Sequence, residues 1–163
     1  MFANVIFDWS GVVLDATEVC HQATMMIFSH FGVKEISLEE FRREWEQPYM
    51  LFYKKYIPAA LPQEESSLYR ASLKKLPKPD LVPGMKELLQ ECQRASVKMV
   101  VLSGDPRENI LSEIEKFGLQ NIFQEINSEA HDKAEVIHEV LKRNNFNPQE
   151  TLFAGDTTHE IKA

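Results

Sequence analysis

Several side chains that could do chemistry stand directly after short apolar segments or at the start of a helical pattern. Asp8 follows the apolar run of residues 4–7, and a hydroxyl group, a lysine and two acidic residues come later in the chain. These later groups are Ser103 after residues 97–102, Lys133 at the start of a helical pattern, and Asp156 with Glu160 after residues 151–154. A carboxylate beside hydroxyl and ammonium donors is suited to attacking or holding an anionic group.

The apolar segments have the pattern of buried parallel strands. Such a strand is a continuous hydrophobic run, and an open α/β sheet binds its ligands at the carboxyl ends of its strands. Taken alone, Asp8 would be interpreted as a turn or helix-cap aspartate, since aspartate is common in turns. Because the strand ends of a parallel sheet face one side, we expect Asp8, Ser103 and Asp156 to converge there.

Strands and helices alternate through most of the chain. The expected strands cover residues 3–7, 97–102, 122–126 and 151–154. Helical patterns lie between successive strands from residue 83 onward. Repeated β-α-β units predict an α/β fold, a three-layer, Rossmann-like parallel sheet with helices on both faces.

An all-helical stretch, residues 16–79, interrupts this alternation and ends in a stiff Pro-Lys-Pro-Asp segment. We therefore expect an α/β core formed by residues 1–15 and 80–163 and an inserted helical cap formed by residues 16–79. The chain stops at Ala163, just inside the helix expected after Asp156. The core is accordingly predicted to be truncated at its C-terminal end.

Local signals give further expectations. Ser37 and Glu40 form a capping box at the start of a cap helix that Pro48 kinks or divides. Asp105 is expected to cap the helix after residues 97–102, with Pro106 at its first position. A stripe of aromatic side chains at helical spacing could line a substrate pocket, but such a stripe is more typical of a core. The stripe consists of Phe41, Trp45, Tyr49, Phe52, Tyr53 and Tyr56.

The composition excludes several classes of function. A net charge of −7 and a pI near 5.3 argue against a nucleic-acid-binding groove. Cys20 and Cys92 lack Cys-x-x-Cys spacing, so neither a disulfide framework nor a thiolate zinc site is indicated. No stretch approaches the ~20 apolar residues of a membrane helix, and the N-terminus does not resemble a signal peptide. We expect a cytoplasmic protein with no nucleic-acid or membrane partner.

Together, the motifs resemble those of the haloacid dehalogenase superfamily of phosphatases and related hydrolases. Residues 8–15 resemble its first motif, usually Asp-x-Asp-Gly-(Thr/Val), and Ser103 resembles the second. Lys133 resembles the third, and Gly155-Asp156 with Glu160 resembles the fourth, Gly-Asp-x-x-x-(Asp/Glu). Each motif is short, but all four occur in the family's order and span nearly the whole chain.

The resemblance implies a Mg²⁺-dependent phosphatase that acts on a small phosphorylated metabolite through an aspartyl-phosphate intermediate. Asp8 would be the nucleophile. The family pattern places Mg²⁺ between Asp8, Asp156 and the backbone carbonyl of Ser10, with Glu160 behind these ligands. The helical insertion matches the family's small cap, which closes over the site and favours small substrates.

Within the same scheme, Lys133 would hold phosphoryl oxygens as a point charge, and Ser103 with the Gly104 amide would donate hydrogen bonds to them. The first motif departs from the family at Ser10, where phosphatases usually carry a second, catalytic aspartate. A serine hydroxyl is a poor acid and base near pH 7. With serine at the catalytic position 10, the rates of leaving-group protonation and water activation could be lower by on the order of 10²–10⁴-fold.

Two other interpretations stay open. Phosphonoacetaldehyde hydrolases of the same superfamily also lack the second aspartate and often carry tryptophan at the position of Trp9. They cleave a C–P bond with a cap lysine as a Schiff base, a role open here to Lys54 or Lys55, although a solvated lysine pair is the simpler interpretation. Alternatively, the chain is a catalytically weakened protein of the same fold that binds rather than turns over its ligand.

Overall fold

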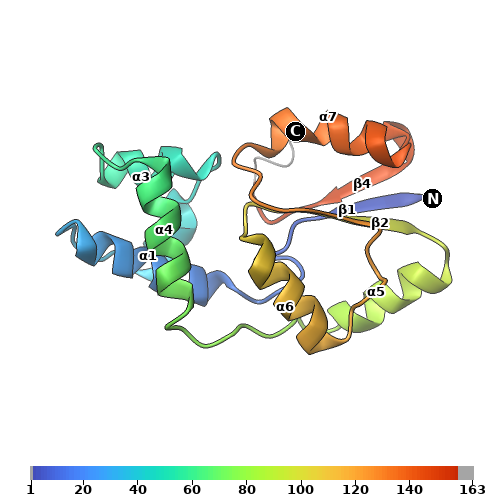
Figure 1. The fold of residues 1–163 in the computed structure, drawn as a ribbon, viewed down its shortest axis with the longest axis horizontal. Coiled ribbons are helices and arrows are strands. Elements are labelled where there is room, and N and C mark those ends of the chain that lie inside the picture. The colour runs from blue at the N-terminus through green and yellow to red at the C-terminus, as the bar shows by residue number, and fades with distance from the viewer. Residues whose placement is uncertain (1, 158–163) are drawn as a thin grey trace. The chain divides into compact units, whose positions relative to one another are not determined.

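The computed structural model describes residues 2–157 of the 163-residue chain, and Figure 1 shows their helices and strands. The chain forms two compact units. One consists of Met1–Asp15 with Asp80–Ala163, and the other consists of Ala16–Pro79. Within the described residues, all strands lie in the first unit, so we refer to the two as the α/β unit and the helical unit.

The strands of the α/β unit form one parallel sheet, as the sequence predicts. Phe7, the last residue of the first strand, pairs with Val101 on one side and with Ala154 on the other. The carboxyl ends of three strands therefore lie side by side. The strands are β1 (Asn4–Phe7), β2 (Lys98–Leu102), β3 (Glu125–Asn127) and β4 (Thr151–Ala154), in the order β3-β2-β1-β4.

The third strand begins later than the sequence predicts. A strand was expected over residues 122–126, but Ile122 lies in a turn. The side chain of Phe123 turns its ring toward Phe7 and Trp9 in edge contacts, with centroids 6.2 and 5.8 Å away. The apolar character of this segment thus reflects packing of rings against each other, and strand pairing starts only at Glu125.

Helices cover both faces of the sheet. Figure 1 shows α7 (Lys133–Asn144) on one face and α5 (Met85–Arg94) with α6 (Arg107–Phe117) on the other, so that the sheet is the middle of three layers. A short 3-10 helix, Pro148–Glu150, leads into β4. The core on the α7 side consists of Ile6, Val100, Leu102, Ile137, Val140 and Phe146.

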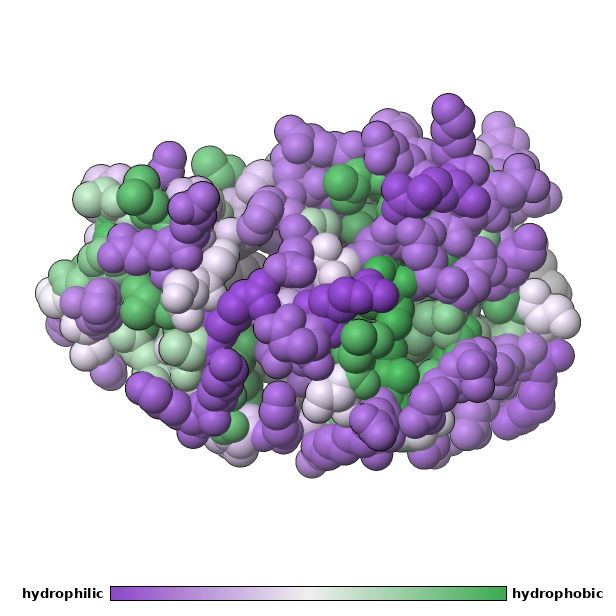
Figure 2. All heavy atoms as spheres, viewed as in Figure 1, coloured by the Kyte–Doolittle hydropathy of each residue, from purple (hydrophilic) through white to green (hydrophobic). Residues whose placement is uncertain are grey.

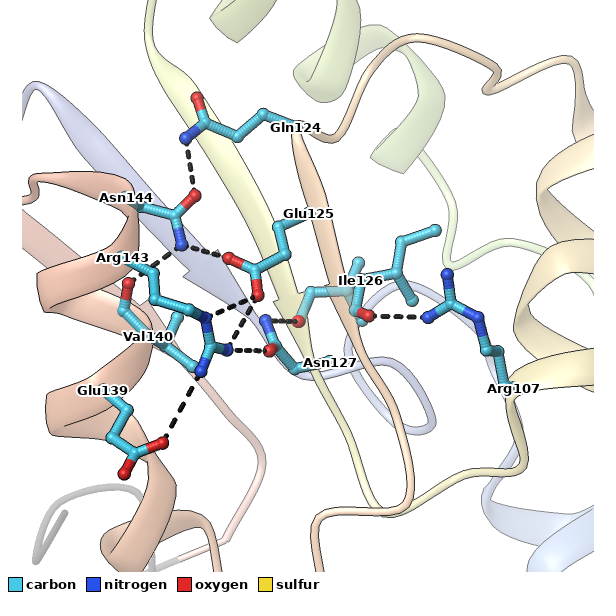
Figure 3. Close-up of polar contacts among 10 residues, drawn as sticks. Arg107, Gln124, Glu125, Ile126, Asn127, Glu139, Val140, Arg143 and Asn144 are labelled. Atoms are coloured by element: carbon cyan, nitrogen blue, oxygen red, sulfur yellow. Dashed lines mark hydrogen bonds and ion pairs between the residues drawn. The ribbon is translucent and has the colours of Figure 1, made fainter.

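Polar contacts tie the last turn of α7 to the edge strand β3 (Figure 3). Arg143 Nη2 donates to Glu125 Oε1 at 2.7 Å and to Asn127 Oδ1 at 2.6 Å. Asn144 Nδ2 also donates to Glu125, and Asn127 Nδ2 donates to the Val101 carbonyl on β2 at 3.1 Å. The last turn of α7 is thus bonded to β3, and β3 is bonded through Asn127 to β2.

The helical unit is built from four helices. Ser37 Oγ accepts a hydrogen bond from the Glu40 amide at 3.1 Å, as expected for a cap. Pro48, which has no N–H to donate, divides the expected second helix into two. The helices are α1 (Thr17–His30), α2 (Leu38–Glu44), α3 (Tyr49–Tyr56) and α4 (Pro62–Leu73).

The aromatic stripe of the helical unit forms part of its core. Phe41, Phe52 and Tyr53 are almost fully buried, and the other members of the stripe pack against them. Phe28 of α1 stacks on Phe52 with ring planes 14° apart and centroids 6.0 Å apart. Burial of this kind stabilises a fold by about 1.5–3 kcal/mol per large apolar side chain. The interpretation of the stripe as core therefore agrees with the structure.

The surface is ordinary for a globular chain. Figure 2 shows that hydrophilic side chains cover most of the face in view, with smaller hydrophobic groups between them. Apolar atoms contribute roughly half or more of the accessible surface of folded proteins, so exposed apolar residues need no special explanation. None of the helices in residues 2–157 is long and apolar enough to cross a bilayer.

Candidate active site

A buried ion pair lies where β1 ends. Asp8 follows directly after β1, and its Oδ2 accepts a hydrogen bond from Lys133 Nζ at 2.6 Å. Lys133 is the first residue of α7, whose N-terminus is capped by Asp132 through a 3.0 Å bond from the Ala134 amide. The side chains of Lys133 and Asp8 are only 1% and 6% exposed. Two residues 125 positions apart in sequence thus lie in direct contact.

Burial raises the pKa of Asp8 to about 7, because the charged form loses its hydration. The ammonium group of Lys133 opposes this effect by attraction and by its hydrogen bond, while the negative charge of Asp105 adds to it. Asp8 is thus a carboxyl group whose ionised form one lysine stabilises only in part. A second cation beside it would favour the carboxylate.

The turn after Asp8 is held by backbone hydrogen bonds. The Trp9 amide donates to Asp8 Oδ1 at 2.7 Å, and the Asp8 amide donates to the Ala154 carbonyl at 2.9 Å. The Trp9 carbonyl accepts from the amides of Val13 at 2.8 Å and Leu14 at 3.0 Å. These bonds fix the Asp8 carboxylate relative to β4 and to the turn that carries Ser10 and Gly11.

Asp156 lies against the same turn. Gly11 has φ +85°, and a Cβ atom built on it would lie 2.1 Å from Asp156 Oδ2. Only glycine adopts this conformation readily, and only glycine leaves room for the carboxylate. Ser10, at the preceding position, is partly exposed. The structure therefore brings Asp8 and Asp156, the two predicted metal ligands, to one loop, with Asp8 buried and Asp156 exposed.

Ser103 lies buried at the end of β2, with its hydroxyl group bonded to Asp105. Ser103 Oγ donates to Asp105 Oδ2 at 2.9 Å, and the Asp105 amide donates back to Ser103 Oγ at 3.2 Å. The prediction that Asp105 caps the next helix is wrong. Pro106 has an extended ψ of 134°, so that α6 begins only at Arg107, and the Asp105 carboxylate turns to the serine.

The bond to Asp105 affects what Ser103 can do. A serine hydroxyl has a single proton, and here that proton is directed to a carboxylate. Donation to a phosphoryl oxygen would require the hydroxyl to rotate away from Asp105. Gly104, the other predicted phosphate-binding residue of this loop, is exposed between Ser103 and Asp105.

The residues of the site suit a magnesium ion better than a softer metal. Within residues 2–157, no three His, Cys, Asp or Glu side chains gather closely enough to hold an ion. Mg²⁺, however, keeps several waters and commonly takes only one or two carboxylates. Asp8 and Asp156 would supply two, and the backbone carbonyl of Ser10 lies in the same turn as Gly11. Glu160, predicted behind these ligands, lies outside the described residues.

The contacts of three residues were not predicted from the sequence, although two of these residues, Asp105 and Trp9, were singled out there in other roles. The third is Glu113, whose Oε2 accepts a hydrogen bond from Trp9 Nε1 at 2.7 Å. Asp105 lies just before a helix, so it was expected to cap that helix and not to bond to Ser103. The bond between Trp9 and Glu113 joins residues 104 positions apart and has no local sequence signal.

Comparison with known proteins agrees with this architecture. A family model described as haloacid dehalogenase-like hydrolase matches residues 5–163. Among curated proteins, phosphoglycolate phosphatase of Synechococcus elongatus is 22% identical over 163 residues, which cover 98% of this chain and 77% of the relative.

Solved structures have the same fold. A haloacid dehalogenase-like family protein from Streptococcus pneumoniae superimposes with a TM-score of 0.78 at 21% identity, over 99% of this chain and 79% of that one. A variant of CbbY from Rhodobacter sphaeroides, solved in complex with xylulose-(1,5)bisphosphate, gives a TM-score of 0.74 at 20% identity, over 100% and 81% of the two chains. At such identities the likeness concerns the fold alone.

Proposed function

The chain belongs to the haloacid dehalogenase-like hydrolase family, and from this premise we propose that it is a Mg²⁺-dependent phosphatase of small phosphorylated metabolites. The observation that carries the proposal is the buried pair of Asp8 and Lys133 at the end of β1. The proposed substrate class agrees with the names of two similar proteins, a phosphoglycolate phosphatase and a protein solved with a sugar bisphosphate.

In the proposed reaction, Asp8 is the nucleophile. One carboxylate oxygen of Asp8 forms a bond to phosphorus while the bond from phosphorus to the leaving oxygen breaks, which gives an aspartyl-phosphate. Water then attacks this phosphorus, releases inorganic phosphate and restores the Asp8 carboxylate. The 2.7 Å bond from the Trp9 amide to Asp8 Oδ1 fixes the orientation of the carboxylate, and Oδ2 faces Lys133.

Lys133 and the Ser103 loop hold the phosphoryl oxygens in this proposal. The ammonium group of Lys133 lies beside the nucleophile and offsets the negative charge that an incoming phosphate brings. The Ser103 hydroxyl and the Gly104 amide add hydrogen bonds once the hydroxyl turns from Asp105. A fixed donor of this kind typically contributes about 10²–10³-fold to turnover.

Asp8, Asp156 and the Ser10 carbonyl are the groups that would hold Mg²⁺. The ion, when bound, neutralises charge on the phosphate and so permits attack by an anionic carboxylate. Two features support this assignment. The Asp156 carboxylate fills the space over Gly11, and the buried Asp8 carboxyl has a raised pKa that a second cation would lower.

The Ser10 position narrows the substrates that we propose. An alkoxide leaving group needs a proton in the transition state, whereas an acyl or aryl phosphate releases a weaker base. A serine at position 10 cannot supply that proton efficiently near pH 7. We therefore place substrates with good leaving groups first within the proposed class.

The surroundings of the two cap lysines, Lys54 and Lys55, do not favour the alternative in which a lysine cleaves a C–P bond. A Schiff-base lysine needs a lowered pKa, which burial or a neighbouring cation provides. Lys55 is exposed and pairs with Glu44, whose carboxylate raises the pKa of Lys55. Lys54 is also exposed. Neither side chain has the environment that this chemistry requires.

The proposal is tested by phosphate release from a panel of compounds, each assayed with Mg²⁺ and with a chelator. The panel contains acetyl phosphate, p-nitrophenyl phosphate, phosphoglycolate, sugar phosphates and phosphonoacetaldehyde. We expect Mg²⁺-dependent release from the phosphates. Release only from phosphonoacetaldehyde, with borohydride trapping of a lysine, would show C–P chemistry instead. Binding without release from any compound would identify a non-catalytic relative.

The metal site is tested by Gly11→Ala, with Gly84→Ala as the matched control. Both glycines have positive φ, +85° and +80°, but only at Gly11 would a Cβ atom meet another group, the Asp156 carboxylate. Both variants should lose about 1–2 kcal/mol of stability from backbone strain. We expect Gly11→Ala alone to weaken Mg²⁺ binding, by tenfold or more in calorimetric titration. Equal Mg²⁺ affinities in the two variants would remove Asp156 from the site.

A further inference from the structure

We propose that Glu113 of α6 is a positioning residue for the nucleophile, and that it acts through the indole of Trp9. The inference rests on the proposed function, because it assigns Asp8 the role of nucleophile. Glu113 itself would not touch the substrate. It would hold the turn after β1 in the geometry that presents the Asp8 carboxylate.

The contact between the two residues is direct and buried. Trp9 Nε1 donates to Glu113 Oε2 at 2.7 Å, a short bond for a nitrogen donor. Trp9 is fully buried, and Glu113 is only 6% exposed. A glutamate is rarely buried to this extent unless it is paired, since its desolvation is costly. Its burial beside Trp9 therefore calls for a specific role.

Trp9 is the residue on which the turn depends. Its amide donates to Asp8 Oδ1 at 2.7 Å, and its carbonyl accepts from the amides of Val12, Val13 and Leu14 at 3.3, 2.8 and 3.0 Å. The indole, the amide and the carbonyl belong to one residue. Because the ring is fully buried in a close-packed interior, a shift of the indole is expected to displace the backbone of Trp9 and with it the hydrogen bond that orients the nucleophile.

Packing alone does not require this hydrogen bond. The ring of Trp9 already contacts Phe123 edge to face, with centroids 5.8 Å apart, and an apolar ring such as phenylalanine could fill much of the same space. The hydrogen bond between the indole N–H and the Glu113 carboxyl group fixes the orientation of the indole ring within that space. In the proposed role, this buried polar pair favours the one orientation of the indole in which the N–H reaches Glu113.

The expected size of the effect follows from the geometry of attack. A misplacement of about 1 Å at a reacting atom can cost about 10²-fold in rate. We expect Glu113→Ala to lower kcat by about 10- to 100-fold and to change KM by less than about threefold, since phosphate-binding groups stay in place. Glu113→Gln keeps an acceptor oxygen at the same position and should retain most of kcat.

The test compares these two variants with Trp9→Phe and with a control on the same helix. Trp9→Phe removes the donor and should lower kcat as Glu113→Ala does. The double variant should be little worse than either single one, because both remove the same interaction. Glu115→Ala changes an exposed glutamate two residues further along α6 and should leave kcat unchanged. The substrate used throughout is p-nitrophenyl phosphate with Mg²⁺.

A second readout does not depend on turnover. The chain has two tryptophans, so in a Trp45→Phe background the indole N–H signal of Trp9 can be followed alone by NMR. Glu113→Ala should shift this signal upfield and speed amide exchange at Trp9, Val13 and Leu14 by tenfold or more, with β2 amides unchanged. Glu113→Gln should restore slow exchange.

The two readouts separate failure of this inference from failure of the proposed function. If the wild-type chain releases no phosphate but the exchange pattern appears, the positioning contact stands and the phosphatase proposal falls. Unchanged exchange in the turn, or acceleration of equal size throughout the α/β unit, would overturn the inference. A kcat for Glu113→Ala within threefold of the wild type, in an active enzyme, would also overturn it.

Discussion

The α/β unit and the helical unit each contain a carboxyl group whose pKa burial raises to about 7. In the α/β unit it is Asp8, which is paired with Lys133 and stands at a strand end. In the helical unit it is Glu65, which is 4% exposed and accepts hydrogen bonds from Tyr53 and Ser66. Burial is the largest cause in both cases.

The partners of the two carboxyl groups differ. Asp8 has a cationic neighbour and faces a turn that also carries Asp156, so its charged form can be stabilised when a ligand arrives. The hydroxyl groups around Glu65 are uncharged and belong to a packed helical core, where Tyr53 also contacts Thr24 at 3.2 Å. A raised carboxyl pKa alone does not identify a catalytic residue. The strand-end position and the charge of the partner are the features that favour Asp8 over Glu65 as the nucleophile in our proposal.

The largest expected contrast is between Asp8→Asn and Glu65→Gln. Each replaces a buried carboxyl group by an amide of nearly the same shape. We expect Asp8→Asn to lower kcat/KM for p-nitrophenyl phosphate by about 10³-fold or more, because an amide is not a nucleophile. Glu65→Gln should stay within threefold of the wild type. If Asp8→Asn kept wild-type activity, or if both variants lost it, the distinction between the two regions would fail.

A second contrast concerns the partners, through Lys133→Met and Tyr53→Phe. Lys133→Met removes the cation and leaves Asp8 buried without it, so the pKa of Asp8 should rise further and its carboxylate should become scarcer. Activity should fall by about 10²-fold. Tyr53→Phe removes the uncharged hydroxyl that contacts both Glu65 and Thr24, and it should change activity by less than twofold. Circular dichroism would verify that both variants are folded, since breaking a buried ion pair can cost about 3–5 kcal/mol. Similar activity in Lys133→Met and the wild type would contradict the role of the cation.

The parts of the α/β unit that have a local sequence pattern could be predicted from the sequence. The apolar runs before Asp8, Ser103 and Asp156 are strands, and parallel pairing explains why the residues after them meet at one edge. Lys133 was predicted at the start of a helix because an apolar helix face follows it, and the structure begins α7 at this residue. These features depend on periodicity, which a single sequence shows directly.

Polar pairs between distant segments could not be predicted in the same way. The bond from Trp9 to Glu113 and the hydrogen bond from Tyr53 to Glu65 each require knowledge of which helix faces which residue. In the sequence, Glu113 and Glu65 resemble exposed helix glutamates. Their burial is a property of tertiary packing, and that is also why β3 began at Glu125 instead of Ile122.

The smallest expected effect is on stability and comes from the pH dependence of Glu65. Its pKa is about 7 in the folded chain and 4.5 in the unfolded reference, so the folded state binds more protons between these values. The free energy of unfolding therefore falls as the pH rises from 4.5 to 7, and the contribution is fully present only below that window.

Glu65→Gln, which does not titrate, should lack this loss, so that the stability difference between variant and wild type changes by on the order of 2 kcal/mol between about pH 5 and 8. Urea unfolding at both pH values measures it, and Glu64→Gln, an exposed neighbour on α4, is the control that should show no such change. Added Mg²⁺ should leave the Glu65 effect intact, because Glu65 has no part in the proposed metal site. If the stability difference between Glu65→Gln and the wild type did not depend on pH, Glu65 would be ionised in the folded chain over this range. Asp8 and Glu65 would then share only their burial, and not a raised pKa.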